Sequence, residues 1–173
     1  MPSSLNKKVG LAALIMMASV LLSRVIGLLR EVIIAQVGGA NAAVDAYNVA
    51  FNLPDILNHV IGSGFLSVTF IPIFSAYLAR EKEAEGWRVF SIILCAFGAV
   101  LAALIAAVWI FADVFVPLSA PGLTDPAQIA AAVRMTRIML PGQLFFFAGG
   151  MLMAVQFAKE QFKLPALAPL IYN

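Results

Sequence analysis

Residues 89–112 read VFSIILCAFGAVLAALIAAVWIFA, a run of apolar and small side chains without one charged group. A helix that crosses a lipid bilayer needs about 20 largely apolar residues, because each residue advances it by only about 1.5 Å. This run is long enough, and no ionised group interrupts it. It therefore predicts a transmembrane helix, around which the rest of the chain can be interpreted.

The composition of the whole chain agrees with a membrane fold. Of its 173 residues, 62% are hydrophobic and 12% are charged, and the mean hydropathy is +0.98. Soluble domains carry roughly 25% charged and 45–50% apolar residues, so a water-soluble fold could not hide this apolar surface. The net charge of +2 is too small to suggest a nucleic-acid partner. One cysteine and one histidine exclude an internal disulfide and a Cys/His metal cluster.

Similar apolar segments on both sides complete the predicted architecture. The expected helices are residues 10–37, 43–79, 87–116 and 126–158, and residues 164–173 resemble the opening of a fifth helix. Asp125 and Pro126 form a good helix start, because Asp is a preferred N-cap and Pro suits the first helical position. We therefore predict an all-α, polytopic transmembrane helix bundle of about four helices and the start of a fifth, extending over residues 1–173.

Positively charged residues gather at three of the expected helix ends. They are Lys7, Lys8, Arg80, Lys82, Arg88, Lys159 and Lys163. With four crossings these all fall on one side of the membrane, which the positive-inside rule makes cytoplasmic. We therefore expect a multi-pass protein with a cytoplasmic N-terminus. Arg134 and Arg137 are exceptions, and we expect them at the outer interface or facing the bundle.

The first expected helix contains three charged residues, Arg24, Arg30 and Glu31. No small-x-small cleavage site lies between the apolar run of residues 10–22 and these charges, so this segment is expected to stay as a membrane helix rather than be removed as a signal peptide. Charges inside a membrane segment are costly, which makes each a functional candidate. They form either a structural ion pair to a neighbouring helix or a cationic wall for an anionic substrate, because guanidinium groups match phosphate oxygens.

A second polar series follows along the next expected helix. Its members recur at steps of three or four residues: Asn41, Asp45, Asn48, Asn52, Asp55, His59 and Ser63. This spacing lines one face of a helix, which Pro54 should bend near its middle. Such a long stripe cannot face lipid tails, so it faces other helices or a water-filled cavity. We favour the cavity, because helix association needs only one or two polar groups.

Enzyme signatures are missing from the sequence. It has no glycine-rich phosphate loop, no nucleophile elbow and no metal-spaced set of ligands. A membrane-embedded hydrolase would need a nucleophile and a base, for which His59 beside Asp55 is thin evidence. We therefore expect no catalytic residue, no metal site and no cofactor, and do not expect an enzyme.

Short motifs throughout the chain match a known pattern. They are SRVIGLLRE (residues 23–31), VDAYNVAF (44–51), LPDIL (53–57), GFLS (64–67), FIPI (70–73), APGL (120–123) and LPALAP (164–169). Together they resemble the bacterial lipid II flippase (MurJ) family, which belongs to the multidrug/oligosaccharidyl-lipid/polysaccharide exporter superfamily. The resemblance covers essentially the whole chain and is most specific in its first hundred residues.

This resemblance implies a transporter. Members of the family have fourteen helices in two lobes and move the undecaprenyl-pyrophosphate-linked peptidoglycan precursor, lipid II, to the outer leaflet by alternating access. The chain would then be an N-terminal fragment of an inner-membrane flippase, with lipid II and membrane lipids as partners and the C-terminal lobe missing. By analogy, Arg24 and Arg30 would line the central cavity and contact the pyrophosphate, and Asp45 would serve in gating.

The other expected substrate-binding residues come from the second helix: Asn52, Asp55, Asn58, His59 and Ser63. Many members of the family carry a basic pair in place of Asn58 and His59 and a glutamate in place of Ser63. The cavity here would hold less fixed positive charge, since His59 adds charge only when protonated. The alternatives are a flippase for another polyprenyl-linked glycan or amphiphile, or a small membrane scaffold subunit that transports nothing.

Overall fold

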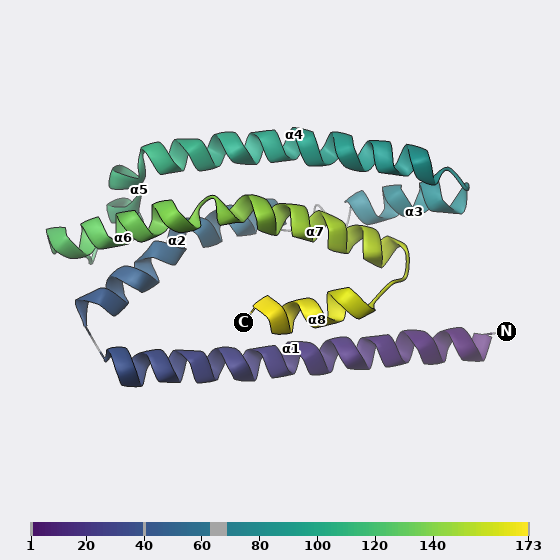
Figure 1. Ribbon diagram of the computed structural model, residues 1–173, viewed down its shortest axis with the longest axis horizontal. Coiled ribbons are helices and arrows are strands. Elements are labelled where there is room, and N and C mark those ends of the chain that lie inside the picture. The colour runs from purple at the N-terminus through teal and green to yellow at the C-terminus, as the bar shows by residue number, and fades with distance from the viewer. Residues whose placement is uncertain (1, 40, 63–68, 173) are drawn as a thin grey trace.

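The computed structural model describes residues 2–39, 41–62 and 69–172, and these form helices and short connections without a strand. In chain order the helices are α1 (Pro2–Gly38), α2 (Ala42–Gly62), α3 (Ile71–Ala79), α4 (Glu83–Ile110), α5 (Ala112–Ser119), α6 (Pro126–Met139), α7 (Gly142–Ala158) and α8 (Lys163–Tyr172). The chain runs back and forth along the length of the molecule, and α8 then returns toward its middle (Figure 1). The predicted all-α bundle is confirmed.

Within the described residues, three helical stretches are long and apolar enough to cross a membrane. They are Ala13–Gly38, Glu83–Ile110 and Pro126–Ala158. Many large apolar side chains on them stay exposed, including Leu28, Ile110 and Phe145. Helices that are apolar all round suit a lipid environment, in which exposed leucine and phenylalanine cost nothing. These three stretches therefore identify the fold as a membrane fold.

The structure divides three of the helices that the sequence predicts as continuous. In the segment 43–79, α2 ends at Gly62, and a separate helix, α3, starts with Pro72 as its second residue. Proline suits the first turn of a helix, where its missing N–H would have no helical partner. The residues between 62 and 69, among them Ser63, lie outside the described part of the chain.

The other two divisions lie at Phe111 and at Pro141. Phe111 separates α4 from α5, and nothing in the local sequence explains that break. Pro141 separates α6 from α7, because proline cannot donate to the carbonyl of Arg137 four residues earlier. Pro141 thus interrupts a stretch, Pro126–Ala158, that is long enough to span a membrane.

Helices α2 to α7 pack around two clusters of buried apolar side chains. The larger cluster joins α2, α3, α4 and α7 through residues such as Phe70, Phe74, Leu101, Phe147 and Met151. The smaller cluster joins α2, α5 and α6 through Ala46, Ala112, Val116, Ala132 and Val133. Small side chains let membrane helices approach closely, which fits the dense packing of α2 against α6. We call α2–α7 the bundle.

Pro54 lies inside α2 and is fully buried. As a proline it lacks the N–H that would bond to the carbonyl of Ala50, one turn earlier. The hydroxyl of Thr136 in α6 donates to this Ala50 carbonyl over 3.2 Å, and the hydrogen bond is buried. A hydroxyl from a neighbouring helix thus replaces the donor that proline removed, as membrane helices commonly require.

A tight corner joins α1 to α2. Gly39 has φ +63°, a left-handed conformation that glycine adopts without strain, and its N–H bonds to the carbonyl of Ala35. A Cβ on Gly38 would lie 2.6 Å from the Val44 side chain, so this position is also restricted to glycine. Asn41 then caps α2, accepting hydrogen bonds from the backbone N–H groups of Ala43 and Val44.

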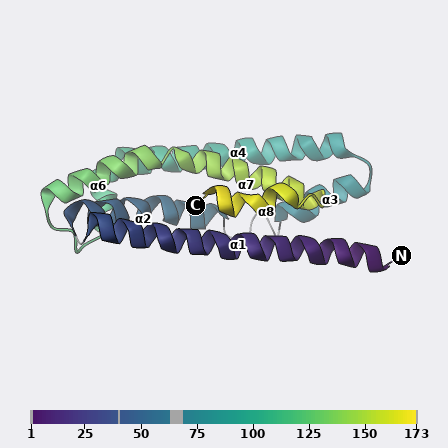
Figure 2. The same cartoon turned by 60° about the horizontal axis from the view of Figure 1, so that its bottom comes forward.

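Helix α1 forms one side of the molecule and packs mainly along α8 (Figure 2). The hydroxyl of Ser23 in α1 donates to the carbonyl of Pro169 in α8 over 2.6 Å. Ser19, one turn earlier, is also buried, but its hydroxyl has no hydrogen-bond partner within the described structure. We call α1 and α8 the outer pair, since they touch the bundle far less than the bundle helices touch one another.

Helix ends that carry most of the expected cytoplasmic cations lie at one end of the molecule. The N-terminus, the α3–α4 turn and the α7–α8 connection are together there (Figure 1). Lys159, at the end of α7, forms an ion pair with Glu83 at the start of α4 and lies 5.4 Å from the ring centre of Trp87. These contacts tie the two cationic connections together.

Arg137 lies toward the opposite end and faces the bundle, while Arg134 is exposed. The Arg137 guanidinium donates to Asp113 over 2.6 Å and to the carbonyl of Trp109 over 3.1 Å. It also lies 5.4 Å from the centre of the Trp109 ring. Arg137 therefore connects α6 to the end of α4 and to α5, which is one of the two expected locations.

Candidate functional site

A polar pocket of about 620 Å³ lies where α1 faces α2 and the bend between α6 and α7. Arg30 and Glu31 of α1 form one wall. The opposite wall comes from α2, α6 and α7 and includes Tyr47, Asn48 and Asp55. The pocket exists because α1 stands away from the bundle at this level, and the break at Pro141 turns α7 beside it.

Arg30 is the cation of the polar pocket. Its Nη2 lies 3.2 Å from Oε1 of Glu31, and the two side chains remain 50% and 59% exposed. A guanidinium has five N–H donors, and among the described residues this is its only hydrogen bond. Arg30 is therefore held by a neighbouring carboxylate but stays open to the pocket, with donors left for an anion.

The charges of the pocket lining are mixed. Among the described residues, one guanidinium from Arg30 faces two carboxylates, from Glu31 and Asp55. This fragment of the wall is therefore not strongly cationic by itself. Tyr47 and Asn48 add a phenol and a carboxamide, which donate and accept hydrogen bonds without charge. The arrangement can bind a ligand that carries both phosphate oxygens and hydroxyl or amide groups.

The expected site residues do not all meet in this pocket. Arg30 and Asp55 line it, whereas Asn58 lines a second, apolar pocket beside it. Arg24 is exposed on α1 and lines neither of these two pockets. Asp45 is exposed in the first turn of α2. The structure thus places these side chains in several different environments along α1 and α2.

Two further members of the polar stripe turn away from the pocket. Asn52 donates from Nδ2 to the carbonyl of Ser119 at the end of α5, over 3.4 Å. His59 is exposed, and its Nδ1 lies 3.0 Å from the carbonyl of Asp55 in its own helix. Asn52 is offset from Asp55 by about 60° around the helix, because each residue turns it by about 100°. That offset is enough to direct Asn52 at another helix.

Sequence reasoning left four polar lining residues of this pocket outside the candidate set. Asn48 belonged to the polar stripe, and Glu31 was recognised only as a charge in α1. Tyr47 gave no signal, because aromatic residues are common in membrane helices. Gln143 carried the clearest missed signal, as one of two carboxamides in the mostly apolar helix α7. Polar side chains within a membrane span are costly and therefore informative.

Comparison with known proteins agrees with the membrane architecture. A family model described as lipid II flippase MurJ matches residues 34–173. The chain belongs to this family. The matched region starts within α1 and covers all of the bundle and α8, while Arg24 and Arg30 precede it.

Individual relatives that bear the name of this family are also similar to the chain. The chain is 37% identical over 158 residues to the lipid II flippase MurJ of Burkholderia cenocepacia, covering 88% of the chain and 30% of that relative. It is 31% identical over 172 residues to the probable lipid II flippase MurJ of Bdellovibrio bacteriovorus, covering 97% and 32%. For the lipid II flippase MurJ of Thermosipho africanus the identity is 28% over 151 residues, covering 87% and 31%. The chain thus spans about a third of the length of these relatives.

Proposed function

We propose that this chain is part of a flippase that moves lipid II, the undecaprenyl-pyrophosphate-linked peptidoglycan precursor, across the bacterial inner membrane by alternating access. Membership in the lipid II flippase MurJ family supports this proposal. It also makes a scaffold subunit, or a carrier of a different cargo, less favoured. The chain acts as a transporter rather than as an enzyme, and its partners are the lipid-linked substrate, membrane lipids and a C-terminal lobe.

The observation that carries the mechanism is Arg30 in the polar pocket. Arg30 lies within the apolar stretch Ala13–Gly38, where an isolated cation would be unfavourable. Its half-exposed guanidinium is stabilised by the ion pair with Glu31. A pyrophosphate that enters this space can take up the remaining N–H donors of Arg30, since guanidinium pairs with phosphate oxygens in a bidentate manner.

Two more residues have proposed roles in the same cycle. Arg24 lies six residues before Arg30, or about 9 Å along the helix axis and about 120° around it, and its proposed role is to contact the anionic substrate from outside the polar pocket, toward the N-terminal end of α1. Asp45 lies in the first turn of α2, close to the α1–α2 corner, and is suited to gating against a second lobe. Alternating access then requires the two lobes to rock around a site near mid-membrane.

The orientation of the proposed transporter follows from its cations. The N-terminus, the α3–α4 turn and the α7–α8 connection lie at one end, and this is the end rich in lysine and arginine. The positive-inside rule assigns this end to the cytoplasm. The polar pocket, nearer the α1–α2 corner, then lies toward the outer half of the membrane.

The test is to replace Arg30 by Ala in the full-length transporter, expressed in bacteria depleted of their own lipid II flippase. Hydrogen bonds to charged groups contribute about 1.5–3 kcal/mol, so the variant should lose roughly tenfold to a hundredfold in transport rate and fail to support growth. Arg80→Ala, at the exposed α3–α4 turn, is the matched control and should support growth normally.

Other variants sharpen the outcome. Arg24→Ala tests whether Arg24 contacts the substrate from outside the polar pocket, and should reduce transport as well. Normal growth and normal lipid II translocation with Arg30→Ala would disprove the pyrophosphate role. If the wild-type transporter translocates a different polyprenyl-linked glycan but not lipid II, the cargo assignment is wrong while the transporter assignment stands.

A further inference from the structure

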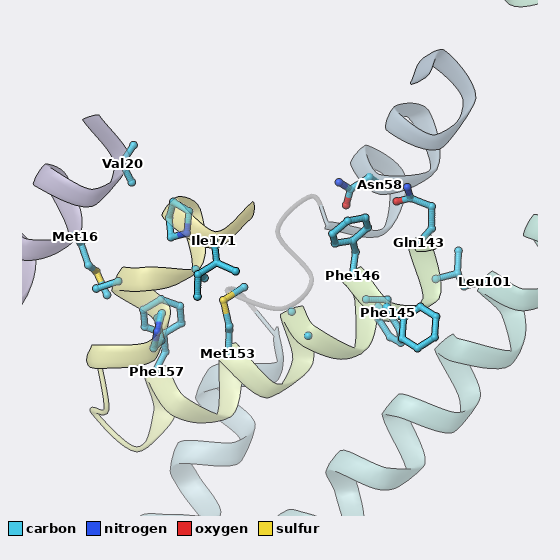
Figure 3. A pocket seen from close by; sticks show the side chains of 17 residues that line it. Met16, Val20, Asn58, Leu101, Gln143, Phe145, Phe146, Met153, Phe157 and Ile171 are labelled. Atoms are coloured by element: carbon cyan, nitrogen blue, oxygen red, sulfur yellow. The ribbon is translucent and has the colours of Figure 1, made fainter. Parts of the chain in front are cut away.

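An apolar pocket of about 1020 Å³ lies between α1, α7 and α8, directly beside the polar pocket. Its walls include Met16, Met153, Phe157 and Ile171 (Figure 3). Gln143 and Phe146 line both pockets, so the polar and apolar spaces meet at these two side chains. The molecule therefore presents a charged pocket and an apolar pocket side by side, with Gln143 and Phe146 at their common boundary.

Gln143 has an unusual environment at this junction. Its side chain is 9% exposed, and its Oε1 is buried without a hydrogen-bond partner within the described structure. Leaving a buried acceptor unpaired costs about 1–3 kcal/mol. In Figure 3 the Gln143 oxygen points toward Asn58 and Phe146, at the polar end of the pocket. Such a costly orientation is explained if a ligand supplies the missing donor.

The local backbone fixes this position. Pro141 breaks the helix, and the N–H of Gln143 bonds to the carbonyl of Leu140 over 3.0 Å as α7 begins. Gln143 thus projects from the first turn of α7, next to the bend that forms the polar pocket. Its side chain is held by rigid helix rather than by a loop, which is what a precise ligand contact requires.

We propose that Gln143 is a specificity-determining ligand contact, which accepts a hydrogen bond from the glycan headgroup of a polyprenyl-pyrophosphate glycan whose hydrocarbon chain enters the apolar pocket. This inference rests on the proposed function. Phosphate oxygens carry no donor for Oε1, whereas sugar hydroxyl and amide groups do. The charged pocket at Arg30, the unpaired acceptor at the junction and the apolar pocket beyond it match the three parts of one amphiphile.

The first experiment compares Gln143→Leu with the wild-type full-length transporter in detergent. The probes are lipid II and a headgroup analogue with a short, soluble chain. Losing one hydrogen bond should weaken the binding of both probes roughly threefold to tenfold. The same variant should raise the melting temperature of the ligand-free protein, because it removes a buried acceptor that has no partner. Gln156→Leu, in the same helix but outside both pockets, should leave binding unchanged.

The second experiment tests the apolar pocket with Met153→Trp, which fills space between α7 and α8. It should weaken binding of lipid II at least tenfold and leave binding of the short-chain analogue unchanged, since only the long chain needs this space. Leu152→Trp is the matched control, because Leu152 is the neighbouring residue on the exposed face of α7. Equal loss for both probes would show that the hydrocarbon chain lies elsewhere.

The outcomes separate this inference from the proposed function. If the wild-type protein binds neither probe, the proposed function fails. If it binds lipid II and Gln143→Leu binds equally well, only the role of Gln143 is wrong. A lower melting temperature for ligand-free Gln143→Leu would also overturn it, because the carboxamide would then have a protein partner.

Discussion

The bundle and the outer pair differ in what their sequences bury. In the bundle, phenylalanine and methionine side chains such as Phe70, Phe74 and Met151 are almost fully buried. In α1 of the outer pair, leucine and isoleucine side chains are mostly exposed, and among the α1 side chains that the structure describes, the buried ones are Ser19 and Ser23. The bundle is held by packing, whereas α1 contacts the rest of the molecule mainly along α8. We call this contact between α1 and α8 the seam.

This difference assigns different tasks to the two regions. The bundle is a rigid support whose apolar clusters fix the direction of α2 and α7. Helix α1 carries Arg24 and Arg30 and leaves its other faces open to lipid or to the pockets. Substitutions in the bundle should therefore change stability, and substitutions on the open faces of α1 should change transport.

The largest expected contrast compares Phe74→Ala in the bundle with Leu28→Ala in α1. Phe74 is 1% exposed and joins the larger cluster, so its removal should cost about 3–5 kcal/mol of unfolding free energy. Leu28 is 66% exposed, and its substitution should change that free energy by no more than about 0.5 kcal/mol. Unfolding of the full-length protein in detergent measures both. Similar losses would mean that α1 is packed as tightly as the bundle.

A smaller effect is expected from Thr136→Val, which keeps the shape of the side chain but removes the donor to Ala50. The buried carbonyl would then have no partner, at a cost of about 1–3 kcal/mol of unfolding free energy. Thr124→Val, in the exposed α5–α6 connection, is the control and should change stability little. Thermal melting of the purified protein distinguishes the two, and equal melting temperatures would show that water replaces the hydroxyl.

The smallest effect concerns the seam of the outer pair. Ser23→Ala removes the hydrogen bond to Pro169 and should destabilise the protein by about 1 kcal/mol. Ser19→Ala, one turn away and equally buried, removes a hydroxyl that has no partner among the described residues, and it should be neutral or stabilising. The same melting experiment compares them. A loss of stability for Ser19→Ala equal to that for Ser23→Ala would show that packing, not hydrogen bonding, holds the seam.

Much of the fold could be predicted because apolar runs and helix caps are local signals. Asp125 caps α6 by accepting a hydrogen bond from the N–H of Ala127, with Pro126 at the first position, as predicted. The break at Phe111 could not be predicted, because no proline or glycine marks it. The division before α3 had a signal in Pro72, but a proline near a helix start and a proline inside a kinked helix look alike in sequence.

The candidate site was harder to predict, because it depends on which helices stand apart. The stripe in α2 indicated a polar face, yet Asn48 and Asp55 reach the pocket while Asn52 bonds to α5. A small angular offset decides between these partners, and only the packing of α5 against α2 fixes it. The unpaired oxygen of Gln143 is a property of three-dimensional surroundings that no sequence pattern carries.

The hydrogen bond from Thr136 to Ala50 also has a consequence for biogenesis. Its two residues are 86 positions apart, so a ribosome completes α2 well before it makes α6. Until α6 arrives, the bent helix has a bare carbonyl that hydrocarbon cannot satisfy. Insertion of α2 into lipid is therefore expected to become more favourable once α6 can supply this donor.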